Sequence, residues 1–275
     1  MEIVVGETEG IINQGATLQG EREPGNQPKY LTDIQISPIS FQTQVGPQAV
    51  TAMSFAFPLV ALEEHFFAKS VAEQYEAAGE IGSYTMFPKP VQEKLLDLGD
   101  VRLSAMNRGQ TAVQIISHAP NRLALTPETC RKANDELHAA VQKHPDRFGA
   151  FATLPMAYPH EAAAELKRCV KELGFVGSLV DNNTEGRFYD SPFFWPIFEA
   201  HCALDVPCYI HPTYHYDAMD VLYRGNYPEK IAESLALHGF GWHSECALHI
   251  LRLFAAKVFD EYPKLKVIIG HMGEM

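Results

Sequence analysis

Residues 160–180, HEAAAELKRCVKELGFVGSLV, contain the pattern that decides the fold. The first part is amphipathic and predicts a helix over 160–173, and Gly174 stands where a helix C-cap belongs. An apolar run, GFVGSLV, follows at 174–180 and predicts a buried strand. A helix that leads directly into a buried strand is typical of a repeating βα unit.

The same alternation runs through most of the chain. Further amphipathic segments predict helices over 91–107, 127–143 and 245–260. Apolar runs predict strands over 57–62, 111–117, 148–154, 206–210 and 265–270. Strands that alternate with helices form a parallel sheet covered on both faces, so the fold class is α/β, with a TIM-type (β/α) barrel as the leading architecture.

The number of strands leaves two interpretations of the architecture. A complete barrel has eight strands and takes about 250 residues, whereas this pattern gives six. We favour a barrel that lacks its last two units, and the alternative is an open α/β sheet. Residues 56–275 would form this incomplete barrel domain. Residues 1–55 are rich in Gln, Gly and Pro with little periodicity, and they predict a poorly ordered N-terminal extension.

Composition excludes several classes of partner. The chain has 275 residues and is 46% hydrophobic, enough for a sizeable core. Its net charge of −12 disfavours nucleic acid and anionic membrane surfaces as partners. No apolar run reaches the roughly 18 residues of a membrane span, and the N-terminus does not resemble a secretory signal. The five scattered cysteines are typical of reduced thiols, so we expect a cytoplasmic protein.

Side chains that bind metals gather where the predicted strands end. They are Glu63, Glu64 and His65 on the first strand, His118 on the second, Asp181 on the fourth, His211 on the fifth and His271 on the sixth. Strand alternation places Glu63 and His65 on one face and Glu64 on the other, where it would be solvated or ion-paired. With His211, they would form a divalent metal site with open positions. The alternative is that each histidine is a hydrogen-bonded structural residue.

The remaining histidines are expected to have different positions in the fold. We expect His249 to pack between a helix and the barrel. For His243, at the start of the same helix, two orientations stay open: toward the site or away from it. His215 and its neighbouring tyrosines line a pocket or lie on a surface loop. We expect surface positions for His138, His144, His160, His201 and His238. The sequence has no G-x-S-x-G, P-loop or G-x-G-x-x-G motif, so it does not support serine hydrolase, NTPase or dinucleotide-binding functions.

Five segments together resemble the metal-dependent decarboxylase branch of the amidohydrolase superfamily. They are ALEEHF, NDELHAAVQKHPDRFGAFATLPM, RCVKELGFVGSLVDNNTEGRFYD, LDVPCYIHPT and FDEYPKLKVIIGHMGE, in that order from residue 61 onward. This branch includes γ-resorcylate, 2,3-dihydroxybenzoate and aminocarboxymuconate semialdehyde decarboxylases.

The resemblance implies roles for six residues in a (β/α)₈ barrel of the amidohydrolase kind. The E-x-H motif supplies the metal ligands Glu63 and His65, and the HP motif supplies His211. His271 lies beside the metal as a catalytic residue, and Glu274 is the carboxylate that orients it. Asp181 stands where relatives offer an Asn, which makes it the candidate for substrate binding.

The implied reaction is the non-oxidative decarboxylation of a small hydroxylated aromatic, or related unsaturated, carboxylic acid. Zn²⁺ is the expected metal, with Mn²⁺ or Mg²⁺ as alternatives. Relatives also imply a homo-oligomer, a dimer or a tetramer. The family aspartate on the eighth strand is a metal ligand and proton donor, and we expect a chain ending at Met275 to lack it. Two other functions stay open: a metal-dependent hydrolase of a lactone or amide, and a truncated inactive paralogue that binds ligand or partners with full-length subunits.

Overall fold

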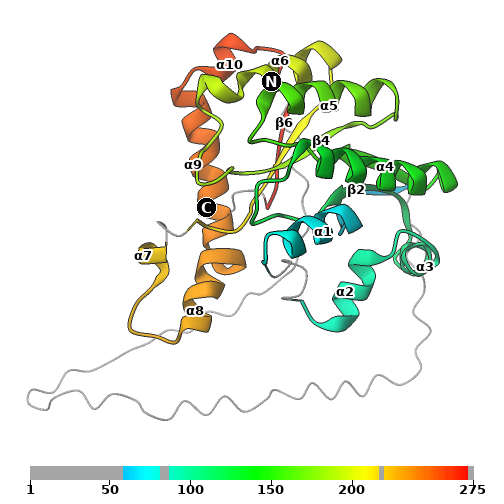
Figure 1. Ribbon diagram of the computed structural model, residues 1–275, viewed down its shortest axis with the longest axis horizontal. Coiled ribbons are helices and arrows are strands. Elements are labelled where there is room, and N and C mark those ends of the chain that lie inside the picture. The colour runs from blue at the N-terminus through cyan, green and yellow to red at the C-terminus, as the bar shows by residue number, and fades with distance from the viewer. Residues whose placement is uncertain (1–57, 81–86, 217–219, 272–275) are drawn as a thin grey trace, which may run out of the picture. The chain divides into compact units, whose positions relative to one another are not determined.

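A computed structural model describes residues 58–80, 87–216 and 220–271 (Figure 1). The predicted extension over 1–55 and the predicted catalytic Glu274 lie outside the described residues. Six strands form one sheet, in which neighbours are parallel and the order follows the sequence. They are β1 (Leu59–Phe66), β2 (Thr111–His118), β3 (Phe148–Ala152), β4 (Gly177–Asp181), β5 (Cys208–His211) and β6 (Val267–Ile269).

All six predicted strands are confirmed, with boundaries that shift by a few residues. A parallel sheet in sequence order, with helices between the strands, is the arrangement of six successive units of a (β/α) barrel. Among the described residues, β1 and β6 each pair along one side only. The carboxyl ends of all six strands therefore meet at one edge of the sheet, where parallel-sheet proteins place their ligands.

Helices connect the strands, and several of them pack on the outer face of this sheet. The described helices are α1 (Lys69–Ala77), α2 (Lys89–Leu96), α3 (Asp100–Arg108), α4 (Pro127–Lys143), α5 (Pro159–Lys171), α6 (Trp195–Leu204), α7 (Asp220–Tyr223), α8 (Glu229–Ser234), α9 (Gly241–Ala255) and α10 (Val258–Glu261). Helix α3 packs on β2, while α4 and α5 pack on β3 and on each other (Figure 1). None of the described helices has the length and apolar character that crossing a membrane requires.

Two predicted helices are each divided in two. The segment 91–107 breaks after Leu96, because Asp97 is extended and its Oδ1 accepts the N–H groups of Gly99 and Arg102 at the start of α3. The segment 245–260 breaks at Lys257, which has a left-handed φ of 61°. The sequence pattern missed α6 because its residues WPIFEAHCAL have no clear polar face.

The core has two parts, one on each face of the sheet. The larger part lies between the strands and helices and includes Ile116, Ala150 and Ile210. A small second cluster contains Phe151, Leu179 and Tyr209, with Ile115 and Ile268 packed against it. Successive residues such as Tyr209 and Ile210 thus belong to different clusters, as strand alternation requires.

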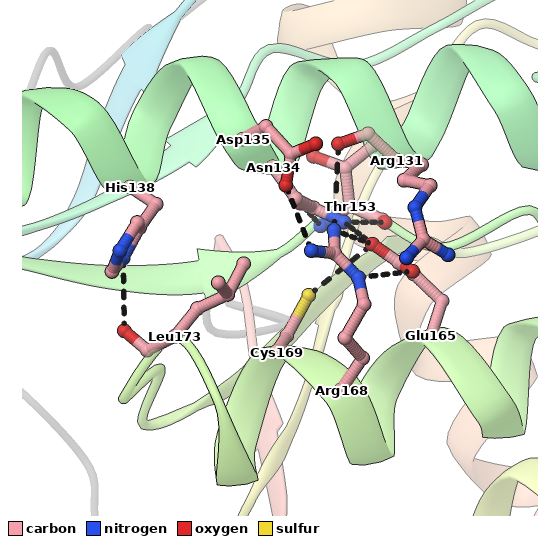
Figure 2. A network of polar contacts seen from close by, with 9 residues as sticks. All are labelled: Arg131, Asn134, Asp135, His138, Thr153, Glu165, Arg168, Cys169 and Leu173. Atoms are coloured by element: carbon pink, nitrogen blue, oxygen red, sulfur yellow. Dashed lines mark hydrogen bonds and ion pairs between the residues drawn. The ribbon is translucent and has the colours of Figure 1, made fainter.

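A buried polar network joins α4 and α5 to the end of β3 (Figure 2). The amide of Asn134 on α4 donates to the carbonyl of Thr153 at 3.0 Å and accepts the Thr153 N–H at 2.8 Å. Its nitrogen also donates to Glu165 Oε1 at 2.8 Å, and Arg168 forms two hydrogen bonds to the same carboxylate. The backbone that leaves β3 is therefore held by helix side chains rather than by the sheet.

Candidate metal centre and adjoining cavity

Glu63, His211 and His271 converge at the carboxyl ends of three strands. Glu63 Oε1 lies 3.3 Å from His211 Nε2 and 3.1 Å from His271 Nε2. The three ligand atoms lie within 4.8 Å of one another. Glu63 Oε2 accepts a hydrogen bond from the hydroxyl of Tyr209, which points to the same side of β5 as His211. One carboxylate and two imidazoles from β1, β5 and the end of β6 therefore share one small volume.

The hydrogen bonds of His211 decide what this group can hold. Its Nδ1 lies 2.6 Å from the carbonyl oxygen of Pro212, so Nδ1 carries the proton in the neutral ring. Nε2 then presents a lone pair toward Glu63 Oε1, and no hydrogen-bond partner for this buried nitrogen is found among the described residues. Two electron-pair donors this close require a proton or a cation between them. A carboxylate facing a neutral imidazole, fixed through its second nitrogen, is the donor set of a divalent metal site.

Electrostatics keeps the Glu63 carboxylate ionised. Burial by itself raises the pKa of Glu63, whereas the contacts with His211 and His271 and the hydrogen bond from the Tyr209 hydroxyl lower it by a larger amount. The net pKa of Glu63 therefore lies well below its usual range. Metal ligands must be deprotonated, and Glu63 meets that condition.

His65 lies beside this group but outside it. Its ring stands edge-on to that of His211, with the centroids 4.9 Å apart, and its Nδ1 lies 3.2 Å from Ser117 Oγ. Burial lowers the pKa of His65 to about 3, so the ring stays neutral. The structure thus brings two of the three predicted ligands, Glu63 and His211, into one group and places His65 against His211.

His271, predicted to lie beside the metal, is in direct contact with Glu63. Its backbone has a left-handed φ of 49°, a rare conformation for a residue with a side chain. Its carbonyl oxygen lies 3.0 Å from Nδ1 of His243, which therefore does approach the site from the start of α9. The ring of Trp242 stands edge-on to that of His271, with the centroids 5.2 Å apart.

Gly270 allows the chain to approach β5 closely just before His271. A Cβ added at this position would lie 2.8 Å from Tyr209 Cε1 and 3.0 Å from the carbonyl oxygen of Ile210. A larger residue would push the end of β6 away from β5. The glycine of the GHMGE motif is therefore needed to bring His271 to Glu63.

A cavity of about 340 Å³ opens at the same edge of the sheet. The residues that line it lie at or after the ends of β2, β3, β4 and β5, and include His118, Asn121, Thr153, Asp181, Tyr189 and Thr213. Neither Glu63 nor His211 nor His271 is in this lining, so the cavity adjoins the three-residue group without enclosing it. His215, Tyr214 and Tyr216 line it as well, which resolves the two interpretations of that loop in favour of a pocket.

Asp181, the predicted substrate residue, is in the cavity wall. It is the strand partner of His211, and its Oδ2 accepts the N–H of Asn121 at 3.2 Å. Burial raises the pKa of Asp181 to about 8, although hydrogen bonds from Asn121 and Thr213 act in the opposite direction. The adjacent Asn182 is fully buried and accepts the Thr213 N–H, so it supports the wall from behind.

Other predicted positions are confirmed or corrected by the structure. Glu64 is on the outer side of β1, where its Oε2 lies 3.8 Å from Arg102 Nη1, as an ion-paired residue should. His249 is buried and its Nε2 accepts the N–H of Tyr189, which confirms its packing role. The surface prediction for His201 is wrong: it is buried, and its Nε2 lies 2.8 Å from Ser178 Oγ.

Sequence reasoning missed several residues around the group. Tyr209 had a usable signal, because it precedes His211 by two residues in a strand and so shares its face. Trp242, whose ring contacts that of His271, and Arg102, which contacts the His65 carbonyl behind the group, had none, because each comes from a helix whose packing the local pattern does not specify.

Comparison with known proteins identifies the family. The family model described as Amidohydrolase matches residues 109–275. The decarboxylase orsB of Emericella nidulans is 45% identical over 221 residues, which cover 79% of this chain and 66% of that protein. The chain spans about two thirds of the length of the curated relatives it matches.

Solved structures are similar over the same part of the chain. The crystal structure of a dihydroxybenzoic acid decarboxylase from Polaromonas sp., with bound manganese and 2-nitroresorcinol, matches with a TM-score of 0.66 and 37% identity. The match covers 79% of this chain and 66% of that one. The 5-carboxyvanillate decarboxylase of Novosphingobium aromaticivorans, complexed with manganese and a nitrobenzoic acid, matches with a TM-score of 0.70 and 31% identity, covering 80% and 66% of the two chains.

The fold, the site and the comparisons agree. The six strands correspond to part of a TIM-type barrel, and the relatives named above are decarboxylases. The chain belongs to the amidohydrolase family, in the branch that contains the aromatic-acid decarboxylases.

Proposed function

We propose that this protein is a metal-dependent carboxy-lyase that removes CO₂ from a small hydroxylated aromatic carboxylic acid. The observation that carries the proposal is the pairing of His211 Nε2 with Glu63 Oε1 beside a cavity at the strand ends. Residues 56–275 carry this site, and residues 1–55 are an extension to it. The decarboxylase activities of orsB and of the Polaromonas enzyme support the reaction class.

We assign the metal to Glu63, His65 and His211. Their donor atoms suit Zn²⁺, which imidazole favours, and also Mn²⁺, which the crystal structures of two relatives contain. A bound divalent ion would offset negative charge on the substrate carboxylate and a neighbouring oxygen. The Pro212 carbonyl and Ser117 hydroxyl would orient the His211 and His65 rings from behind.

The cavity would hold the aromatic ring of the substrate. Its volume of about 340 Å³ suits a single substituted ring, and its lining offers tyrosine rings and polar groups together. With a pKa of about 8, Asp181 is protonated at neutral pH and can donate a hydrogen bond to a substrate hydroxyl. This residue would favour acids with a hydroxyl group beside the carboxylate.

The reaction replaces the carboxylate on the ring with a proton. A proton must add to the ring carbon that bears the carboxylate, which interrupts the aromatic system. The carbon–carbon bond then breaks, CO₂ leaves, and the ring regains its aromaticity. We assign the movement of this proton to Nε2 of His271, oriented by Glu274.

We further propose that the protein is a homo-oligomer, a dimer or a tetramer, that works in the cytoplasm. Exposed apolar side chains on α9, such as Leu251 (65% exposed) and Phe254 (49%), support an interface with a second copy. All five cysteines are free thiols, which supports a reducing compartment.

The test is CO₂ release from a panel of hydroxybenzoates by the purified chain loaded with Mn²⁺ or Zn²⁺. We expect release from at least one acid with a hydroxyl beside the carboxylate, and its loss after chelation and in Glu63→Gln. A folded chain that binds metal, hydrolyses lactones or amides and releases no CO₂ would favour the hydrolase instead. Metal binding with neither reaction would favour an inactive binding subunit.

A further inference from the structure

Strand β1 carries an extra residue at the position of the proposed metal ligands. Ala61 is paired with Gln114 and Glu64 with Ile116, so β1 advances by three residues where β2 advances by two. Such a β-bulge turns side chains out of strict alternation and is common beside active sites. The directions of Glu63 and His65 are thus set by this local irregularity as well as by strand periodicity.

Arg102 contacts the backbone directly after the bulge. Its Nη2 donates to the carbonyl oxygen of His65 at 2.6 Å. Its Nη1 lies 3.8 Å from Glu64 Oε2 and donates to Gln114 Oε1 of β2 at 3.3 Å. One guanidinium therefore joins the residue between the two ligands, the carbonyl of the second ligand and the neighbouring strand.

The guanidinium is itself held in place. Its Nε donates to the carbonyl oxygen of Asp97 at 2.9 Å, and only 8% of the Arg102 side chain is exposed. The break between α2 and α3 supplies this contact, because the Asp97 side chain also accepts the Arg102 N–H. The planar guanidinium has N–H donors at three nitrogens and can make all these bonds at the same time. A lysine ammonium has its donors on a single nitrogen and cannot.

Glu64 thus has a role of its own on the outer face. It points away from Glu63, and its charge is balanced by Arg102 rather than by a metal. The pair lies on the side of β1 opposite to the site, behind the two proposed ligands.

We propose that Arg102 is a positioning residue for the metal centre, which fixes the bulged end of β1 so that Glu63 and His65 face His211. This inference rests on the metal site of the proposed function. Loss of the guanidinium would leave the His65 carbonyl and the Glu64 carboxylate without their buried partner, and the ligands would be less preorganised. Outer contacts of this kind commonly change metal affinity by about 10–100-fold.

The test is Mn²⁺ binding to the metal-free full chain, followed by the electron paramagnetic resonance signal of the free ion. We expect Arg102→Lys and Arg102→Gln to weaken binding by about tenfold or more, and Glu64→Gln to weaken it less. Arg108→Gln is the matched control, because it removes an exposed arginine from the same helix, where its side chain bonds Ser104. It should leave the affinity unchanged.

Hydrogen exchange of the metal-free proteins tests the same contact without a metal. Peptides that cover residues 62–67 should exchange faster in Arg102→Lys than in the unaltered chain, with no change in Arg108→Gln. Circular dichroism shows which variants fold. If Arg102→Gln does not fold, Glu64→Gln supplies the test.

The outcomes separate the two proposals. Full Mn²⁺ affinity in folded Arg102→Lys, with unchanged exchange over 62–67, would overturn the positioning role and leave the metal site intact. Absence of Mn²⁺ binding by the folded, unaltered chain would overturn the metal site of the proposed function, and the inference with it.

Discussion

Nε2 of His211 faces Oε1 of Glu63 at 3.3 Å, while Nδ1 of His211 is committed to the Pro212 carbonyl. In the neutral ring this places a lone pair against an ionised carboxylate, an arrangement that is stable only with a cation or proton between them. The two residues come from β1 and β5, which are separated by three other strands in the sheet. They can be in contact only because the sheet curls. The metal-binding account depends on this pair.

The roles of His65 and His271 can be separated by metal content and turnover. His65→Asn should lower metal affinity, because the ring next to His211 is a proposed ligand. His271→Asn should retain metal but lose most CO₂ release, because its Nε2 is assigned to proton movement. Elemental analysis and a CO₂ assay on each variant check this. Metal loss in His271→Asn with full binding in His65→Asn would reverse the two assignments.

Removal of Asn134 should destabilise the chain strongly. The Asn134→Ala substitution removes the buried partner of the Thr153 N–H and carbonyl, and it takes one hydrogen bond from the Glu165 carboxylate, which keeps Arg168 (Figure 2). We expect a loss of about 3 kcal/mol in the free energy of unfolding, measured by urea denaturation. The control is Asp135→Asn, which alters an exposed ion pair to Arg168 and should cost less than about 1 kcal/mol. Equal losses in the two variants would contradict the role of Asn134.

Asp181 should make stability fall as pH rises. Its folded-state pKa of about 8 lies above the ordinary aspartate pKa of 3.8, so between these two pH values the folded chain holds this proton more strongly than the unfolded chain. Its contribution is fully present below pH 3.8 and is lost as pH rises toward 8. Urea denaturation of the metal-free chain should show that its free energy of unfolding decreases from pH 5 to pH 8. This decrease should be larger than the one measured for Asp181→Asn over the same interval. The same decrease in both proteins would show that Asp181 ionises freely.

Much of the fold could be predicted from local patterns. Each strand is a short apolar run, and Gly174 marks the end of the helix before β4. Helix α6 could not be found this way, because its sequence has no amphipathic stripe. Nor could the break at Asp97, where a side-chain cap competes with a helix that local propensity would continue.

The candidate site was partly accessible to the same reasoning. Glu63 and His211 stand at strand ends, and the rule that parallel strands end at one edge brings them together. The extra residue in β1, the Arg102 contact behind it and the Trp242 ring beside His271 all depend on tertiary packing. His271 was expected beside the metal, yet its distance of 3.1 Å from Glu63 follows from the close approach at Gly270.

The most direct test of the central claim is elemental analysis of the purified chain 1–275 beside Glu63→Gln, each after dialysis against Mn²⁺ or Zn²⁺ and removal of free ion. The account predicts about one metal ion per unaltered chain and almost none in the variant, since the amide cannot replace the carboxylate. Equal metal content in the two folded proteins, whether one ion or none, would contradict it.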